Sequence, residues 1–275
     1  MLTRLSIELA KLTRKPRTYL GFAGMAGITC LLMIGFKYGD PFQHMKDRLA
    51  QDFIISGSFI NAAFLARNLV AGAIYMILPL FTCLVCGDLV ASEAADGTLR
   101  TILCRPVSRL SVAVSKYMVG AIYVLTLTFG TGVFAYLLGS LFLGRGSLVV
   151  MEQGIWVFPE HTALIRLVAT YALISVSMLA VGSIAFMIST FLSNANGAII
   201  GAMAMMYAGV IVGEIDYFKS IRPYLFTSYM DKWRLLFISP IDVSELWKAA
   251  GVMLIYSAAA LIIGLIIFQR RDVLS

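Results

Sequence analysis

The stretch LVATYALISVSMLAVGSIAFMISTFLSNANGAIIGAMAMMYAGVIVG, residues 167–213, runs for 47 residues without one Asp, Glu, Lys, Arg or His. A single α-helix of that length would measure about 70 Å, more than twice the roughly 30 Å hydrocarbon core of a bilayer. The chain must therefore turn back within this stretch. The sequence LSNANG at residues 192–197 supplies Ser, Asn and Gly, which favour helix ends and reversals. We expect two membrane-spanning helices joined there by a tight turn.

The composition indicates that the rest of the chain also spans a membrane. Of 275 residues, 60% are hydrophobic and only 13% are charged, which is outside the usual range of soluble domains. The six stretches that are free of charge and long enough to span a bilayer are residues 19–36, 69–87, 117–144, 167–191, 197–213 and 249–268. They do not alternate as transmembrane β-strands do. The sequence predicts an all-α membrane protein with six transmembrane helices, which form one domain over residues 1–275.

Positive charge near the first span predicts the orientation. Residues 1–18 carry one acidic residue, Glu8, against five basic ones, Arg4, Lys11, Arg14, Lys15 and Arg17. Basic flanks stay on the cytoplasmic side, so we expect both termini to be cytoplasmic in the cell (inner) membrane. The sequence pI of about 9.3 is then explained by contact with anionic membrane lipid and not by binding to nucleic acid.

The N-terminal residues 1–18 have the pattern of an amphipathic helix that ends at Pro16. Their apolar positions recur every three or four residues, at Leu2, Leu5, Leu9 and Leu12. Such a helix lies at the membrane interface. It is either a basic anchor or a brace for the bundle.

Two segments on the outer side, residues 37–68 and 214–248, are long enough to hold structure of their own. The second is rich in Tyr and Trp, which favour the headgroup region. We expect short helices at the outer leaflet, which form either a gate or an anchoring belt.

Several kinds of chemistry are missing from the sequence. There is no phosphate-loop motif, and no Gly is followed by Lys, so the chain lacks the usual cradle for nucleotide phosphates. The only histidines, His44 and His161, lie far apart in outer segments, which leaves no pattern for a metalloprotease or a Ser or Cys nucleophile. We therefore expect no catalytic, cofactor or metal site in this chain.

The segment ASEAADGTLRTILCRPVSR, residues 91–109, interrupts the apolar sequence on the predicted cytoplasmic side. Residues 88–95 can continue the second span, Gly97 can end that helix in a left-handed conformation, and Thr98 or Asp96 can cap a new helix. The apolar face of this second helix consists of Leu99, Ile102 and Leu103, and Pro106 ends it. Residues 88–111 thus form either a docking surface rimmed by Arg100, Arg105 and Arg109 or a solvated loop.

The same residues carry a resemblance. The sequence SEAADGTLRTILCRPVSR resembles the cytoplasmic signature of type-2 ATP-binding-cassette permeases, with matching positions Glu93, Gly97, Thr98, Leu99, Pro106, Ser108 and Arg109. The ending FQRRDV, residues 268–273, is similar to the close of many such permeases. Arg100 departs from the pattern, in which an acidic or neutral residue is more familiar.

The resemblance implies an N-terminal elbow helix and, between the second and third spans, a coupling helix that fits into a groove of a separate ATPase subunit. That subunit would bind ATP and Mg²⁺. The residues expected at the contact are Glu93, Asp96, Gly97, Thr98, Leu99, Arg100, Ile102, Leu103, Pro106 and Arg109. The expected assembly has two ATPase subunits and a second permease copy or a paralogous permease. The outer segments are a further surface at which an accessory extracytoplasmic protein could bind.

The expected function is that of a membrane-spanning permease subunit of an ATP-driven exporter. The alternative is a membrane anchor or scaffold without transport, whose cytoplasmic segment only recruits another protein. The third possibility, a transporter coupled to an ion gradient, is disfavoured because the predicted spans contain no charged residue.

Overall fold

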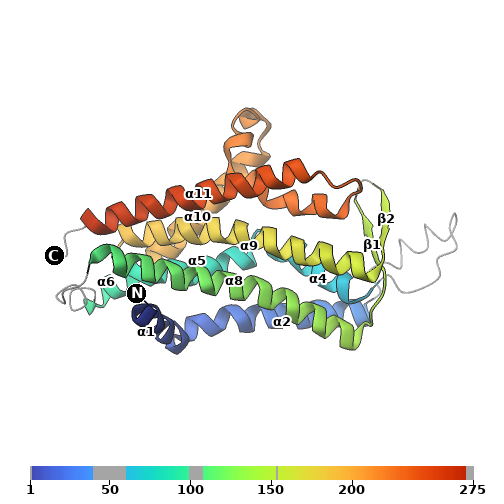
Figure 1. Ribbon diagram of the computed structural model, residues 1–275, viewed down its shortest axis with the longest axis horizontal. Helices are drawn as coiled ribbons and strands as arrows, with labels where there is room; N and C mark the ends of the chain where they lie inside the picture. Colours follow the sequence, from blue (N-terminus) through green and yellow to red (C-terminus); the bar gives the residue numbers. More distant parts are fainter. Residues whose placement is uncertain (1, 40–59, 99–107, 153, 271–275) are drawn as a thin grey trace.

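The computed structural model describes residues 2–39, 60–98, 108–152 and 154–270 as a long helical bundle (Figure 1). The spanning helices are α2 (Pro16–Tyr38), α8 (Arg109–Phe142), α9 (Glu160–Phe191), α10 (Ala195–Glu214) and α11 (Val243–Arg270), together with the bent pair α4 (Ala62–Ala73) and α5 (Ile77–Cys86). These are five helices long and apolar enough to cross a membrane, or six spans if the bent pair counts as one. The prediction of a helical, multi-pass membrane protein is confirmed.

Helix α9 forms the centre of the bundle. More than half of its residues are buried, and it packs against α4, α5, α8, α10 and α11. The predicted turn follows it: α9 ends at Phe191 and α10 begins at Ala195, where the Asn194 side chain accepts a hydrogen bond from the backbone N–H of Asn196 at 3.0 Å. The turn residues therefore do what their chemistry predicts.

Two short helices lie at the end of the bundle that holds both ends of the described chain (Figure 1). They are α1 (Leu2–Arg14) and α6 (Asp88–Ala95). Pro16 is the first residue of α2, a position that suits proline because the N–H it lacks would have no partner there. Gly97 has a φ of +68°, so the left-handed end predicted for the helix after the second span is confirmed.

The second span, predicted over residues 69–87, is a bent pair of helices. Helices α4 and α5 meet at an angle of 63°. Pro79 explains the break: it lacks an N–H for the carbonyl four residues earlier, and its ring would clash with that carbonyl, which belongs to Tyr75.

The span also begins earlier than predicted, and this brings Arg67 into α4. Arg67 is buried because its Nη2 atom pairs with Oε1 of Glu152 at 2.5 Å. Its guanidinium carbon lies 5.1 Å from the ring centre of Phe237 and 5.7 Å from that of Trp233. The charge is tolerated because these contacts replace its hydration.

The end of the bundle opposite both ends of the described chain contains a β-hairpin that was not predicted from the sequence (Figure 1). Strands β1 (Leu148–Met151) and β2 (Ile155–Phe158) form an antiparallel hairpin in which Leu148 pairs with Phe158. Residues 214–248 were expected to form short helices at the outer leaflet. They contain the 3₁₀ helices η1 (Asp216–Phe218), η2 (Arg222–Tyr224) and η3 (Phe226–Phe237).

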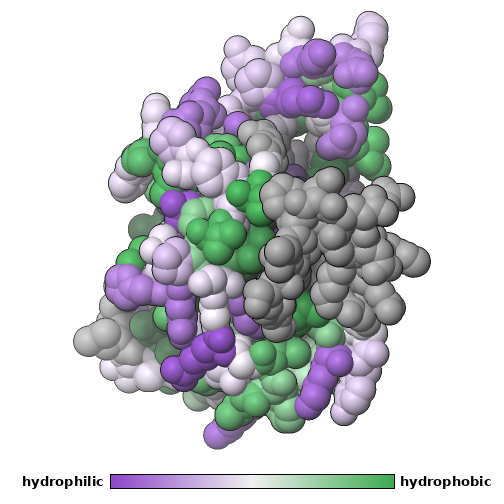
Figure 2. Space-filling view, turned by 90° about the vertical axis from the view of Figure 1, so that its right-hand side faces the viewer, coloured by the Kyte–Doolittle hydropathy of each residue, from purple (hydrophilic) through white to green (hydrophobic). Residues whose placement is uncertain are grey.

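Helix η3 packs inside the bundle against α9, α10 and α11, and its Trp233 and Tyr229 are buried there. The preceding residues, 215–225, project from the side of the bundle (Figure 1). Figure 2 looks onto the hairpin end, and hydrophilic side chains gather on this projection at the top of the view.

Candidate functional site

The candidate site is built around α6, which precedes the predicted coupling helix. The first N–H groups of a helix have no partner within it. Here Ser189 of α9 supplies one: its Oγ accepts hydrogen bonds from the backbone N–H of Val90 at 3.1 Å and of Ala91 at 2.9 Å. All three residues are buried. This contact fixes α6 to the central span.

A second set of contacts, which we call the ionic cluster, joins α6 to the N-terminal helix and to α8. Its members are Glu8, Lys11, Lys15, Arg17, Asp88, Glu93 and Lys116. The Nζ atom of Lys116 lies 2.7 Å from Oε1 of Glu93 and 3.0 Å from Oε2 of Glu8, and its side chain is only 1% exposed. Lys11 bridges the same two carboxylates at 2.8 Å from Glu8 and 3.1 Å from Glu93.

Asp88 forms the other half of the ionic cluster. Its two carboxylate oxygens accept hydrogen bonds from Nζ of Lys15 and from Nη1 of Arg17, each at 2.6 Å. Because Lys15 and Arg17 flank the start of α2, Asp88 ties α6 to the junction of α1 and α2. Charge-assisted hydrogen bonds of this length are among the stronger polar contacts in proteins.

The ionic cluster shifts the titration of its members in α1. Burial would raise the pKa of the Glu8 carboxyl, but Lys116 and Lys11 outweigh it, so this pKa lies below its ordinary value of 4.5. Burial would lower the pKa of Lys11, but Glu8 and Glu93 outweigh it, so this pKa lies above its ordinary value of 10.5. Both groups are therefore charged at neutral pH.

Apart from Arg109, the residues predicted at the ATPase contact fall into three groups. Glu93 faces Lys116 and Lys11 inside the bundle end. Asp96, Gly97 and Thr98 are exposed, and the Thr98 hydroxyl donates to the Glu93 carbonyl at 3.3 Å. Leu99, Arg100, Ile102, Leu103 and Pro106 lie outside the described residues.

Arg109 is the last of the predicted residues, and it begins α8. Its Nη1 atom donates to the backbone carbonyl of Gln269 at 3.2 Å, near the end of α11. The side chain of Ser108 caps α8 by accepting from the N–H of Ser111. The start of α8 is therefore fixed to the end of α11.

Sequence reasoning missed Asp88, Lys116 and Ser189. Lys116 gave the clearest signal, since a lysine between apolar residues of one helix needs a carboxylate when it is buried. Its partner Glu8 is 108 positions away, so spacing could not identify it. Ser189 resembled the many serines and threonines of the spans, most of which only return a hydrogen bond to their own helix, as Ser175 does to Tyr171.

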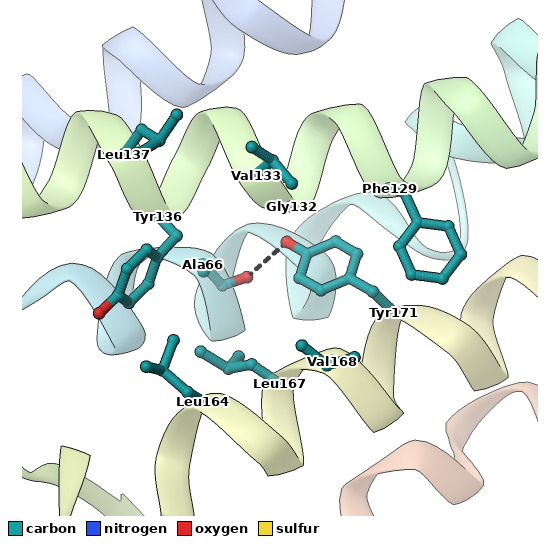
Figure 3. Close-up of a pocket in the computed structure, with 10 residues that line it drawn as sticks. All are labelled: Ala66, Phe129, Gly132, Val133, Tyr136, Leu137, Leu164, Leu167, Val168 and Tyr171. Atoms are coloured by element: carbon teal, nitrogen blue, oxygen red, sulfur yellow. Dashed lines mark hydrogen bonds between the residues drawn. The ribbon is translucent and has the colours of Figure 1, made fainter. Parts of the chain in front are cut away.

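A separate apolar pocket of about 180 Å³ lies between α8 and α9 toward the ends that connect to the β-hairpin. Figure 3 shows its lining, with Gly132 and Val133 on one side and Leu167 and Tyr171 on the other. The Tyr171 hydroxyl donates to the carbonyl of Ala66 at 3.0 Å, which satisfies the one buried polar group in the wall. The pocket suits an apolar chain and offers no group for catalysis.

Metal ligands do not gather anywhere in the described part of the chain, where no group of three His, Cys, Asp or Glu side chains could hold an ion. Cys83 and Cys86 are buried free thiols in α5.

Comparison with known proteins gives two matches. A family model described as "Protein of unknown function (DUF2705)" matches residues 31–274. The chain is also similar to the "Uncharacterized protein YhcI" of Bacillus subtilis (strain 168), with 28% identity over 210 residues. That alignment covers 72% of this chain and 65% of the relative, just under two thirds of its length. Because the family model spans most of the sequence, the chain belongs to the family described as "Protein of unknown function (DUF2705)".

Proposed function

We propose that this chain is the membrane-spanning subunit of an ATP-driven exporter, and that a separate ATPase moves it by docking on residues 88–111. The ATPase would bind ATP and Mg²⁺, and two ATPases would act on two membrane subunits, identical or paralogous. Both termini and α6 would then be cytoplasmic. The chain has no nucleotide motif of its own, so its energy has to come from a partner.

The observation that supports this proposal is the attachment of α6. The helix leads directly toward residues 99–107, and it is held to α9 by Ser189 and to α1 and α8 by the ionic cluster. A load applied to the predicted coupling helix would therefore reach three other helices through short, buried polar contacts. An ATPase can shift such a bundle only by binding one of its conformations more tightly than another.

The test is to purify the full chain in mild detergent from membranes of its native host and to measure ATP hydrolysis in the purified complex. We expect a stoichiometric partner with a phosphate-loop motif and ATPase activity that is retained with the chain. A partner without nucleotide chemistry would overturn the proposal in favour of the scaffold alternative.

Two substitutions at glycines with positive φ give a matched comparison. Proline fixes φ near −65°, so it cannot adopt the φ of +68° at Gly97 or of +82° at Gly144. We expect Gly97→Pro to abolish retention of the ATPase and Gly144→Pro, at the opposite end of the bundle, to leave it intact. The pair Leu99→Asp and Ile102→Asp, which lies outside the described residues, tests the predicted apolar face in the same assay. Retention of the ATPase by both the Gly97 variant and the double variant would refute docking.

A further inference from the structure

A polar cavity of about 180 Å³ lies where α10 ends beside the break in the second span. Its walls come from Tyr75 in the break, from Gly213 and Glu214 at the end of α10, and from Thr227 and Asp231 of η3. Interrupted spans expose polar backbone at membrane depth, and such backbone is tolerated where it lines a cavity. The break thus places polar groups around an open space on the flank of the bundle.

Two buried oxygen atoms in the lining have unused hydrogen-bonding capacity. Thr227 is 3% exposed, and within the described residues its Oγ1 atom has no hydrogen-bond partner. Oδ1 of Asp231 also has no hydrogen-bond partner among these residues, although Nε of Arg234 lies 3.5 Å from it and the Tyr75 hydroxyl donates to the same carboxylate. A buried polar atom without a hydrogen-bond partner is unfavourable, so a ligand that donates to these oxygens would be held by them.

The charges of the cavity lining favour a cation. Among the lining residues, Glu214 and Asp231 contribute two carboxylates against the one guanidinium of Arg222. The C-terminal end of α10 adds partial negative charge, while Arg234 pairs with Asp231 from outside the lining. Arg222 also lines the cavity, but its Nε atom donates to the backbone carbonyl of Gly213 at 2.6 Å. The remaining acceptors, which include the hydroxyl of Ser228, outnumber the cationic groups of the lining.

We propose that this cavity binds a protonated primary amine, whose ammonium group donates to Asp231 and to the Thr227 hydroxyl. An ammonium carries three N–H donors and no acceptor, which matches two unsatisfied oxygens beside a second carboxylate. A cavity of about 180 Å³ has room for the ammonium group and a short alkyl chain. The site goes beyond the proposed function and does not depend on an ATPase.

The test uses the full chain purified in detergent and three four-carbon compounds of nearly equal size: n-butylammonium chloride, n-butanol and sodium butyrate. Thermal unfolding is followed at increasing ligand concentration, since a ligand that binds only the folded state raises Tm. We expect a saturable rise with butylammonium and none with butanol or butyrate.

Isosteric variants test whether Asp231 and Thr227 bind the butylammonium ion. Asp231→Asn removes the charge and Thr227→Val removes the hydroxyl, and each should weaken butylammonium binding at least about tenfold. Asp216→Asn is the matched control, because Asp216 is an exposed acid of η1 outside the cavity lining. It should bind butylammonium as the unmodified chain does.

Three outcomes would overturn the proposal. Stabilisation by butyrate alone would indicate an anion site at Arg222, and equal stabilisation by all three compounds would indicate an apolar cavity. Undiminished binding by both Asp231→Asn and Thr227→Val would place the amine elsewhere. The comparison of the three compounds on the unmodified chain decides the first two even if a variant fails to fold. Failure to retain an ATPase would leave this test unaffected.

Discussion

Lys116 of α8 and Glu93 of α6 face each other with 2.7 Å between Nζ and Oε1, and the lysine side chain is almost completely buried. The same ammonium lies 3.0 Å from Glu8 of α1. One buried cation thus holds together two short helices that have no covalent connection near this point. Without Lys116, the partly buried carboxylates of Glu8 and Glu93 would lose a buried positive charge that pairs with both.

We predict that Lys116→Met lowers the free energy of unfolding by about 3 kcal/mol, because breaking a buried ion pair from one side leaves its partner charge unpaired. The measurement is the thermal unfolding midpoint of the full chain in detergent, followed by circular dichroism. Lys248→Met is the matched control: its side chain is 58% exposed and pairs with Glu245 on the surface, so little change is expected. Equal effects of the two substitutions would contradict the role assigned to Lys116.

The ionic cluster also predicts how stability depends on pH. The pKa of Glu8 is lowered, so its contribution is present above pH 4.5 and is lost as the pH falls through the lower pKa of the folded state. The pKa of Lys11 is raised, so its contribution is complete below pH 10.5 and is lost as the pH rises through the higher pKa of the folded state. Attachment of α1 should be strongest between these limits.

This pH window is measured as Tm against pH for the unmodified chain and for Glu8→Gln. The variant lacks the titrating carboxyl, so its Tm should fall less steeply on the acid side. If the two curves of Tm against pH coincide on the acid side, Glu8 does not contribute to the pH dependence of stability.

Ser189 allows a sharper comparison within one helix. Ser189→Ala removes the hydroxyl that accepts from the buried N–H groups of Val90 and Ala91. This leaves the N–H of Val90, in the first turn of α6, without this acceptor, at a cost of about 1–3 kcal/mol. Ser175→Ala removes only a hydroxyl that donates to the Tyr171 carbonyl of its own helix, so its cost should be small. Thermal unfolding of both variants measures the difference. A larger loss for Ser175→Ala would contradict the capping of α6 by Ser189.

Short-range chemistry made part of this fold predictable. The reversal at residues 192–197 follows from an apolar stretch too long for one span, and the end of the helix before Gly97 follows from a residue that tolerates positive φ. The break before Pro79 was also readable in principle, but a proline near the middle of an apolar stretch does not reveal whether a span kinks or continues.

The remaining features depend on contacts between distant parts of the chain. The hairpin strands contain four residues each, too few for alternation to separate them from a loop. Arg67 lies inside a spanning helix only because Glu152, 85 positions away, pairs with it. The candidate site was located by its motif, whereas the residues that fix it to the bundle became visible only in three dimensions.

The apolar pocket in Figure 3 depends on the absence of a side chain at Gly132. A Cβ atom there would lie 2.8 Å from three atoms of the Tyr171 ring, which is buried and held by its hydrogen bond to Ala66. The ring cannot yield without losing that bond, so Gly132→Ala should destabilise the chain by about 1–3 kcal/mol.

Gly251→Ala is the matched control for this prediction. Nothing lies within 4 Å of a Cβ atom at Gly251, which is inside α11, so alanine should favour the helix by about 0.5–1 kcal/mol and raise Tm. The same substitution in two spans is thus expected to act with opposite signs, because only one of the two glycines has a side chain packed against it. A rise in Tm for Gly132→Ala would mean that Tyr171 can move aside and that the pocket is not fixed by this contact.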